Sequence, residues 1–433
     1  MLINFLIKRP LIGLFLFTVL ISAKNQIPVV STIDIEGNQK TEDYILEREI
    51  RHPIDTPLDT NIVIEDRNRL ENLGLFSQVK WQIIPIKNDS VQLLFRVIES
   101  INKTPPIAFP TFDEDTGWSF VGLWLMKNFR GKNQSLSLSG SIGGKDTYGL
   151  SFSDPWIFGD HVSLSIDIGR TLYGHRFLNK DVDLNNVFLS FGKWFGSKIK
   201  TSIGIEVESK TFIDNNQEDI NFFYFAPVVN VKFDTRDIFW NPSKGVLVSQ
   251  YIHHRQGIES KKWYLTYWSQ SYSWFYKLNK QGKQLIFAVN GTLNSKIGEK
   301  DIYWLNYFGN SFNIRGWSLP DSDLYLSSNQ DFRFGHESIH ASFELRKEII
   351  PKFSTSLGIE LGLIFVLFSD IGIIGDEWDD LKNKMPMYGT GLGIRIPFPL
   401  VGVIRVDYGW GCRDNIWNTG TLHFGIGQKL AIL

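Results

Sequence analysis

The chain has 433 residues, a length that suits two or three soluble domains or one large β-barrel with a small domain attached. Aromatic residues make up 14% of it and hydrophobic residues 43%, and the mean hydropathy of −0.11 excludes a bundle of membrane-spanning helices. This composition is typical of a transmembrane β-barrel, which needs aromatic girdles and a polar lumen; a large soluble β-protein is the alternative. The net charge of −1 gives no reason to expect nucleic acid as a partner, and the single cysteine, Cys412, excludes a disulfide framework and a multi-cysteine metal site.

The N-terminus has the pattern of a secretory signal peptide, which we predict over residues 1–23. Lys8 and Arg9 supply the positive charge, and the apolar run 11–21 is too short to cross a bilayer. Ile21-Ser22-Ala23 is an imperfect cleavage site because Ile21 is large for its position. We therefore expect export, with a retained N-terminal anchor as the alternative.

Residues 31–100 are predicted to form a small α+β domain in the order βααββ. Residues 32–36 alternate as a strand, and Thr41 is the expected N-cap of the first helix. A second helix is expected between residues 59 and 73, because its apolar side chains fall on one face and Gly74 suits its C-cap.

Two further strands, 78–83 and 91–97, complete this domain. Residues 101–115 are then predicted to be a stiff linker, because proline restricts its own backbone and that of its predecessor. From residue 116 to residue 433 the chain reads as strand after strand.

The barrel pattern is clearest in residues 161–169, where valine, leucine and isoleucine alternate with small or polar residues. The same alternation occurs in 134–139, 202–208, 355–362, 391–396, 402–408 and 421–427. Roughly 318 residues at about 20 per strand and turn give about 16 strands, an even number as single-chain bacterial barrels require. The sequence therefore predicts a mainly β protein: an antiparallel transmembrane barrel, closed because an open sheet edge is unstable in hydrocarbon.

One stretch, residues 308–317, combines an arginine with the residues that let a loop turn. Its sequence is Phe-Gly-Asn-Ser-Phe-Asn-Ile-Arg-Gly-Trp, so that Ile314 and Trp317 flank Arg315 and Gly316. A cation at the tip of a structured loop needs a carboxylate partner if it is buried. A plain solvated arginine is the alternative.

Two downstream carboxylates, Glu344 and Asp370, are the expected partners of Arg315. Phe368, Asp370 and Gly372 have a spacing of two, so they point to one face of a strand. Glu344 lies opposite the apolar set of the strand 339–345, so it is expected to point into the lumen.

The run His336-Glu337-Ser338-Ile339-His340 fits the zinc-protease pattern H-E-x-x-H, which requires a helix. Here it leads into an alternating strand, on which His336 and His340 would stand about 13 Å apart and could not share a metal ion. We therefore expect no metal, no cofactor and no catalytic residues. The G-x-S-x-G elbow of a fused lipase and a phosphate loop are both missing from the sequence.

Several motifs, in this order and spacing, resemble the BamA-type family of outer-membrane barrels. Residues 314–317 resemble its loop motif Val/Ile-Arg-Gly-Tyr/Phe, with Trp317 as a mild departure, and residues 31–100 resemble a POTRA (polypeptide-transport-associated) domain. The barrel motifs are Phe152-Ser153-Asp154-Pro155-Trp156; Asp234-Thr235-Arg236-Asp237 with Asn241-Pro242-Ser243-Lys244-Gly245; and Gly391–Arg395, Asp407–Gly409 and His423–Gln428.

The resemblance implies a short, single-POTRA member of the BamA/TamA-like outer-membrane assembly superfamily (bacterial surface antigen family), with its POTRA domain in the periplasm. It also implies that the loop folds back into the lumen, where Arg315 pairs with carboxylates. It places a lateral gate between the first strand, near 118–125, and the last, near 421–426, where Gly425 and Gly427 permit a kink.

The implied function is insertion or translocation of β-rich client polypeptides, with a client strand adding to the edge of the first strand. The partners implied are the outer-membrane bilayer, unfolded β-barrel or secreted clients, and periplasmic chaperones or accessory lipoproteins. One alternative is a two-partner-type secretion pore, although those relatives usually carry two POTRA units and a plug helix. The other is a passive or lipid-handling barrel.

Overall fold

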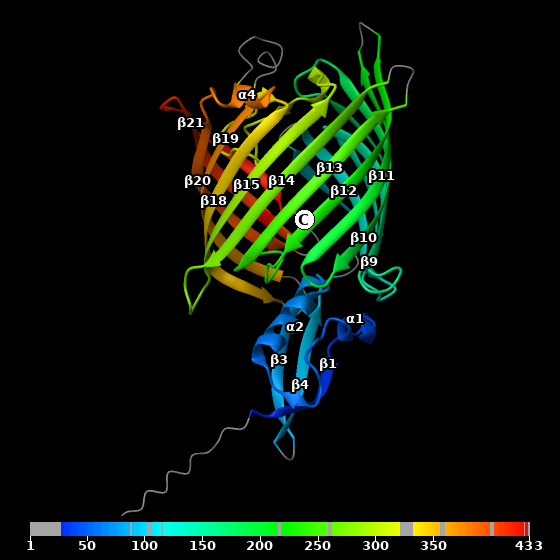
Figure 1. The fold of residues 1–433 in the computed structure, drawn as a ribbon, viewed down its shortest axis with the longest axis vertical. Coiled ribbons are helices and arrows are strands. Elements are labelled where there is room, and N and C mark those ends of the chain that lie inside the picture. Colours follow the sequence, from blue (N-terminus) through cyan, green and yellow to red (C-terminus); the bar gives the residue numbers. More distant parts are fainter. Residues whose placement is uncertain are drawn as a thin grey trace, which may run out of the picture.

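A closed β-barrel and a smaller α+β domain make up the computed structural model, with the small domain against one end of the barrel (Figure 1). The structure describes residues 27–86, 89–101, 106–113, 116–214, 218–258, 262–320, 332–355, 360–398, 402–427 and 429–431. The predicted signal peptide therefore lies outside the described residues. Within them, no helix has the length and apolar character needed to cross a membrane.

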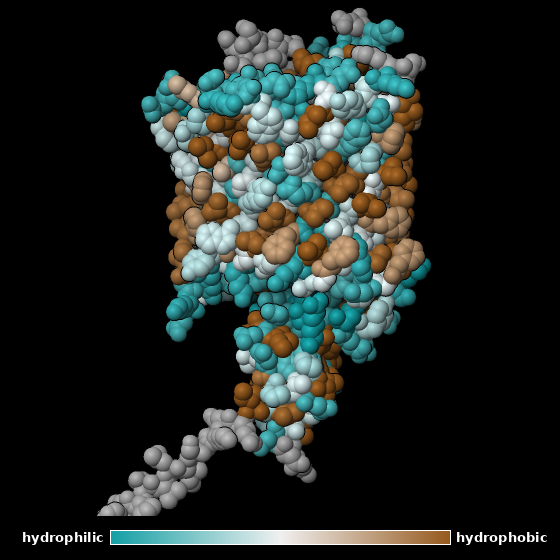
Figure 2. Space-filling model, viewed as in Figure 1, coloured by the Kyte–Doolittle hydropathy of each residue, from teal (hydrophilic) through white to brown (hydrophobic). Residues whose placement is uncertain are grey.

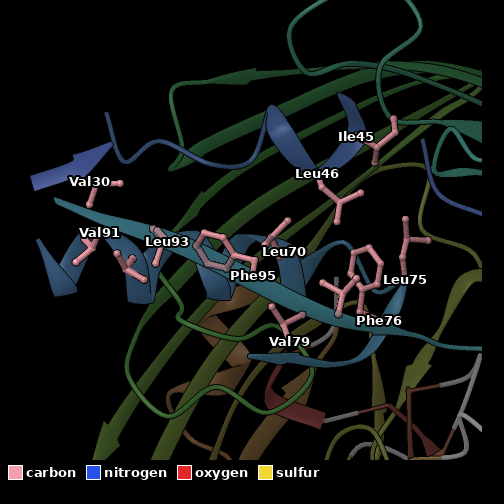
Figure 3. Packing of buried hydrophobic residues seen from close by; sticks show 12 residues of the cluster. Val30, Ile45, Leu46, Leu70, Leu75, Phe76, Val79, Val91, Leu93 and Phe95 are labelled. Atoms are coloured by element: carbon pink, nitrogen blue, oxygen red, sulfur yellow. The ribbon is translucent and has the colours of Figure 1, made fainter. Parts of the chain in front are cut away.

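The small domain carries a four-stranded sheet in the order β2-β1-β4-β3, in which β1 and β4 are parallel. Two helices cover one face of this sheet, and the apolar side chains of both layers meet between them (Figure 3). The element order agrees with the predicted βααββ, with a two-residue strand added. The elements are β1 (Val29–Glu36), α1 (Asp43–Glu47), β2 (Thr56–Pro57), α2 (Thr60–Asn72), β3 (Phe76–Pro85) and β4 (Ser90–Glu99).

The capping of the two helices agrees only in part with the sequence prediction. Helix α2 begins after Asp59, whose side chain accepts a hydrogen bond from the Asn61 N–H, and Gly74 follows the helix with φ +67°. The predicted N-cap Thr41 is wrong, because α1 begins after Glu42. The Thr41 hydroxyl instead donates to Glu99 Oε1 of β4 at 2.7 Å.

Among the described residues, the barrel contains sixteen strands of six or more residues, as predicted, and a two-residue strand, β22 (Ile416–Trp417), that pairs with the end of β21. The sixteen strands are β5 (Ile107–Asp113), β6 (Gly117–Phe129), β7 (Gln134–Gly143), β8 (Lys145–Asp154), β9 (Val162–Gly174), β10 (Asp181–Phe195), β11 (Ile199–Ile213), β12 (Ile220–Asp234), β13 (Gly245–Gly257), β14 (Tyr264–Lys277), β15 (Leu285–Gly298), β18 (Glu337–Ser354), β19 (Glu360–Gly375), β20 (Met387–Phe398), β21 (Gly402–Arg413) and β23 (Thr421–Ile426). Neighbouring strands are antiparallel, and the order closes by placing β23 beside β5.

The structure corrects two boundaries of the sequence analysis. Strand β5 lies inside the expected linker 101–115, so the barrel begins before residue 116 and the strand expected to be first, 118–125, is part of β6, the second. Prolines suggested a linker, but Pro110 is compatible with a strand at the closing seam, where its missing N–H costs little. Of the expected strand 355–362, residues 356–359 lie outside the described residues, whereas residues 360–362 begin β19.

The outer wall of the barrel is apolar, as Figure 2 shows by a band of hydrophobic residues between two hydrophilic rims. On β18, Ile339 and Phe343 are 45% and 40% exposed on this wall, whereas Glu344, one residue further on, is 1% exposed inside. The lipid-facing and lumen-facing sets therefore alternate as predicted.

Aromatic side chains fill the end of the lumen that lies farthest from the small domain. The segment between β15 and β18 includes the short helix η1 (Ile302–Trp304) and a hairpin of β16 (Asn306–Tyr307) and β17 (Phe334–Gly335). Tyr303 and Trp304 pack on Phe212, Phe222 and Trp263 of the barrel strands and the loop before β14. This packing holds η1 against the distal ends of neighbouring barrel strands.

Candidate functional site

The segment 308–317, here called the lumen loop, is held in its bent shape by two asparagine side chains. Asn313 Oδ1 accepts hydrogen bonds from the N–H groups of Gly309 and Asn310 at 2.8 and 3.2 Å, and Asn313 Nδ2 donates to the Tyr307 carbonyl. Asn310 Oδ1 accepts from the Phe312 N–H at 2.9 Å. The loop therefore presents its tip in a fixed conformation.

Arg315 at the tip is fully buried and lies between the two carboxylates that the sequence analysis named. Its Nε and Nη2 donate to the two oxygens of Asp370 at 2.8 and 2.9 Å, and its backbone N–H donates to Asp370 Oδ2 at 3.0 Å. Its Nη1 donates to Glu344 Oε1 at 2.7 Å. Phe368 lies under the guanidinium, 3.7 Å from its carbon to the ring centroid.

The ion pairs extend beyond these three residues into a network that the sequence analysis missed. Asp407 of β21 lies 3.4 Å from Arg315 Nη1 and accepts from Arg395 Nη1 of β20 at 2.6 Å. Glu344 also accepts from Arg395 Nη2 at 3.2 Å and from Arg346 Nε at 2.8 Å. Arg346, Arg395 and Asp407 occupy lumen-facing positions of strands, so the spacing of two that identified Glu344 would have found them as well.

The loop tip approaches the barrel wall so closely that side chains are excluded. A Cβ on Gly316, whose φ is +89°, would lie 2.6 Å from the Trp410 carbonyl carbon, and one on Gly389 would lie 1.8 Å from the Arg315 carbonyl oxygen. The Trp317 ring covers Gly411, and its Nε1 donates to the Tyr388 carbonyl at 2.7 Å. A Cβ on Gly372 would likewise lie 2.6 Å from the Phe308 ring and 2.9 Å from Ile314 Cδ1.

The loop tip is also bonded to the last barrel strand, β23. The Gly316 N–H donates to His423 Nε2 at 2.9 Å, and Asn418 Nδ2, just before β23, donates to the Gly316 carbonyl at 2.7 Å. The two glycines named as a gate kink lie at the end of this strand. Gly425 makes room for Arg405, since a Cβ there would lie 2.5 Å from Arg405 Nη2. Gly427 ends the strand with φ +84°.

The mid-barrel signature lies away from the lumen loop, at the end of β12 next to the small domain. Arg236 Nε and Nη2 donate to the two oxygens of Asp234, each at 2.9 Å. The Asp237 side chain accepts from the Ser243 N–H at 2.9 Å, which shapes the turn to β13. The Asp237 carbonyl accepts a hydrogen bond from Asn72 Nδ2 of α2 at 3.1 Å. This turn therefore contacts the small domain and not the lumen loop.

The small domain and the barrel border a cavity of about 960 Å³ at their junction, lined by α2, by the ends of β9 to β12 and by the turn before β13. Beside it, the Arg48 guanidinium lies 3.9 Å from the Trp156 ring centroid. Burial lowers the pKa of Arg48 and raises the pKa of the neighbouring Glu49 carboxyl. A polar, partly buried junction of this kind can separate without exposing a large apolar surface.

The H-E-x-x-H run forms the start of β18 and not a helix. His336 Nδ1 contacts Asp376 Oδ1 at 3.1 Å at the distal rim, whereas His340 packs edge-on against Phe308 in the lumen. The two histidines thus have separate partners, and the metalloprotease interpretation lacks the helix that it needs.

Comparisons of sequence identify relatives for both domains. Residues 128–430 match the Omp85 superfamily domain, and residues 28–100 match the POTRA family, described as a surface antigen variable number repeat. The chain is 23% identical over 436 residues to the outer membrane protein assembly factor BamA of Nitratidesulfovibrio vulgaris, covering 94% of this chain and 52% of that protein. It is 31% identical over 151 residues to BamA of Neisseria meningitidis, covering 34% and 18%. It thus spans about half the length of these relatives or less.

Solved structures share the fold. BamA from Haemophilus ducreyi lacking POTRA domains 1-3 aligns with a TM-score of 0.56 at 19% identity, over 92% of this chain and 83% of that one. CdiB from Escherichia coli gives 0.55 at 11% identity, over 93% and 76%, and CdiB from Acinetobacter baumannii gives 0.51 at 15%, over 93% and 74%. The family matches and this fold lead to one conclusion: the chain belongs to the Omp85 superfamily and is an outer-membrane protein whose POTRA domain lies in the periplasm.

Proposed function

We propose that this protein inserts or translocates β-rich client polypeptides at the outer membrane, and that a client strand enters at the seam between β23 and β5. These two strands have six and seven residues, whereas the other fourteen long strands have ten to eighteen. Because ladder hydrogen bonds scale with paired length, we expect fewer of them at the seam than between the longer strands. Pro110 in β5 also lacks an N–H group to donate.

The bond between the lumen loop and β23 is the observation on which the proposal chiefly depends. The contact from Gly316 to His423 joins the seam strand to the Arg315 network, so a change in the position of β23 acts on the loop. A loop that only closed the barrel would need no direct bond to the seam.

Insertion into a bilayer is downhill for a β-barrel, so the proposed activity needs no nucleotide, cofactor or catalytic residue. The clients would meet the POTRA domain first, by pairing along β3, an edge strand of its sheet. Periplasmic chaperones and accessory lipoproteins are further proposed partners.

A secretion pore of the two-partner type is the second candidate, since the structures that share this fold include CdiB. The short strands β23 and β5 favour a lateral exit over the axial exit of such a pore. A passive or lipid-handling barrel is the third candidate.

The test uses the purified full chain in liposomes and follows folding of a denatured β-barrel client by its heat-modifiable gel migration. We expect faster client folding than in empty liposomes, and loss of this acceleration in Arg315→Ala while the variant's own barrel stays folded. A disulfide that locks β23 to β5 should also abolish it, and unchanged activity in the locked protein would refute the lateral route. No acceleration by wild type would favour the pore or the passive barrel, which ion conductance would separate.

A further inference from the structure

The described end of the chain turns inward after β23 instead of continuing along the barrel wall. Gly427, at φ +84°, donates its N–H to the Val403 carbonyl at 2.7 Å, and the short helix η3 (Lys429–Ala431) follows inside the lumen. Lys429 and Leu430 are 6% and 2% exposed, so both side chains are buried.

Lys429 contacts the lumen loop and its carboxylate partner at once. Its Nζ lies 2.9 Å from Asp370 Oδ2, the same oxygen that accepts from the Nε and backbone N–H of Arg315. It also donates to the carbonyl of Asn313, two residues before Arg315 in the loop. Lys429, which follows the seam strand, and Arg315 of the loop therefore share one oxygen of Asp370.

Leu430 contacts a part of the barrel wall that lies several strands away from β23. Its side chain packs in a buried cluster with Phe275 of β14 and Ala288 of β15. Four long strands, β18 to β21, separate β15 from β23 in the barrel order. Lys429 thus connects the end of β23 to the lumen loop, and Leu430 connects it to strands β14 and β15.

We propose that Lys429 and Leu430 form a strap that holds β23 in the closed barrel, and that the strap is released when the seam opens. The strap is short: it rests on one ion pair, one carbonyl contact and one apolar side chain. A segment held by so few contacts has a low free energy of local opening, so it can detach and rebind without unfolding of the barrel. Its mechanical role follows from the contacts, whereas its role in client entry rests on the proposed function.

Water can also replace the ion pair between Lys429 and Asp370. A buried lysine loses its hydration, and Asp370 and the Asn313 carbonyl offset that loss only while η3 stays in place. Once released, the ammonium regains water, and Asp370 keeps its two-point contact with Arg315. The loop can therefore stay anchored while β23 moves.

The test is hydrogen exchange of the full chain in lipid nanodiscs without any client, comparing wild type with Lys429→Met and Leu430→Ala. Both variants should speed amide exchange in β23 by at least about tenfold, the effect of one lost charged hydrogen bond or of the cavity left by a buried leucine, with a smaller change in the loop. Strands β10 to β12 should not change. Lys429→Arg, which keeps the charge, should stay near wild type.

Two control variants remove the same chemistry at exposed sites. Lys382 in the helix after β19 has a 74% exposed side chain beside one carboxylate, and Leu278 in the turn after β14 is 49% exposed. Lys382→Met and Leu278→Ala should leave exchange in β23 unchanged. Unchanged exchange in the strap variants, or equal acceleration in all barrel strands, would overturn the proposed strap.

Client folding then separates the strap from the proposed function. If the strap variants open β23 and also alter the rate of client folding, both inferences stand. Faster exchange in β23 combined with no client folding by wild type would keep the strap and refute the insertase. Altered client folding without a change in exchange would refute the strap alone.

Discussion

Glu344→Gln removes one charge from the centre of the lumen network and keeps nearly the same shape. Glu344 accepts hydrogen bonds from Arg315 at 2.7 Å, from Arg346 at 2.8 Å and from Arg395 at 3.2 Å. Glutamine keeps one acceptor oxygen but turns an amide N–H₂ toward guanidinium groups. The substitution therefore leaves buried cations without their counter-charge.

The charge count of the network sets the direction and the size of the effect. Four arginines and Lys429 face three carboxylates, so the network already has a net charge of +2, and Glu344→Gln raises it to +3. Breaking one buried ion pair costs about 3–5 kcal/mol. We expect a loss of that size in the free energy of unfolding, below the sum of three separate charged hydrogen bonds because their contributions are not additive.

Urea unfolding of the full chain in detergent micelles, followed by tryptophan fluorescence, measures this loss. Glu348→Gln is the matched control, because Glu348 lies on the same strand and accepts one bond, from the Gln284 N–H at 3.1 Å. The control should lose less than about 1 kcal/mol. If Glu344→Gln loses no more than the control, the ion-pair network does not stabilise the barrel and the reasoning fails.

Further predictions follow from the same contacts. Arg405→Gln should leave the urea midpoint unchanged or raise it, because the guanidinium nitrogens of Arg405 have no hydrogen-bond partner among the described residues; a midpoint drop as large as that of Glu344→Gln would contradict this. Gly425→Ala should destabilise the barrel, since its Cβ would lie 2.5 Å from Arg405 Nη2, and adding Arg405→Ala should restore most of the loss in the same melt. Asn72→Ala should speed hydrogen exchange at the POTRA–barrel junction several-fold by removing two hydrogen bonds, whereas Asn68→Ala on the same helix should not; equal effects would refute the docking role.

The sequence predicted the barrel because its signal is local. A spacing of two decides which side chains face lipid, so Ile339 and Phe343 were placed outside and Glu344 inside before any contact was known. The same rule applied to Arg395 and Asp407, but nothing in the sequence alone gave them a common partner. Local rules also misled, because prolines in an expected linker concealed strand β5.

The sequence by itself determined the fold class, the strand number and the faces of the strands, since each depends on neighbours along the chain. Only the tertiary structure added partners to the Arg315 network beyond Glu344 and Asp370. Asp407 lies 92 positions from Arg315 in the chain, and Lys429 contacts the Asp370 carboxylate, because barrel closure returns β21 and β23 to the lumen loop. The tertiary structure likewise decided that Gly425 makes room for a guanidinium and that Leu430 packs with Phe275 and Ala288, because closure, unlike periodicity, depends on every strand at once.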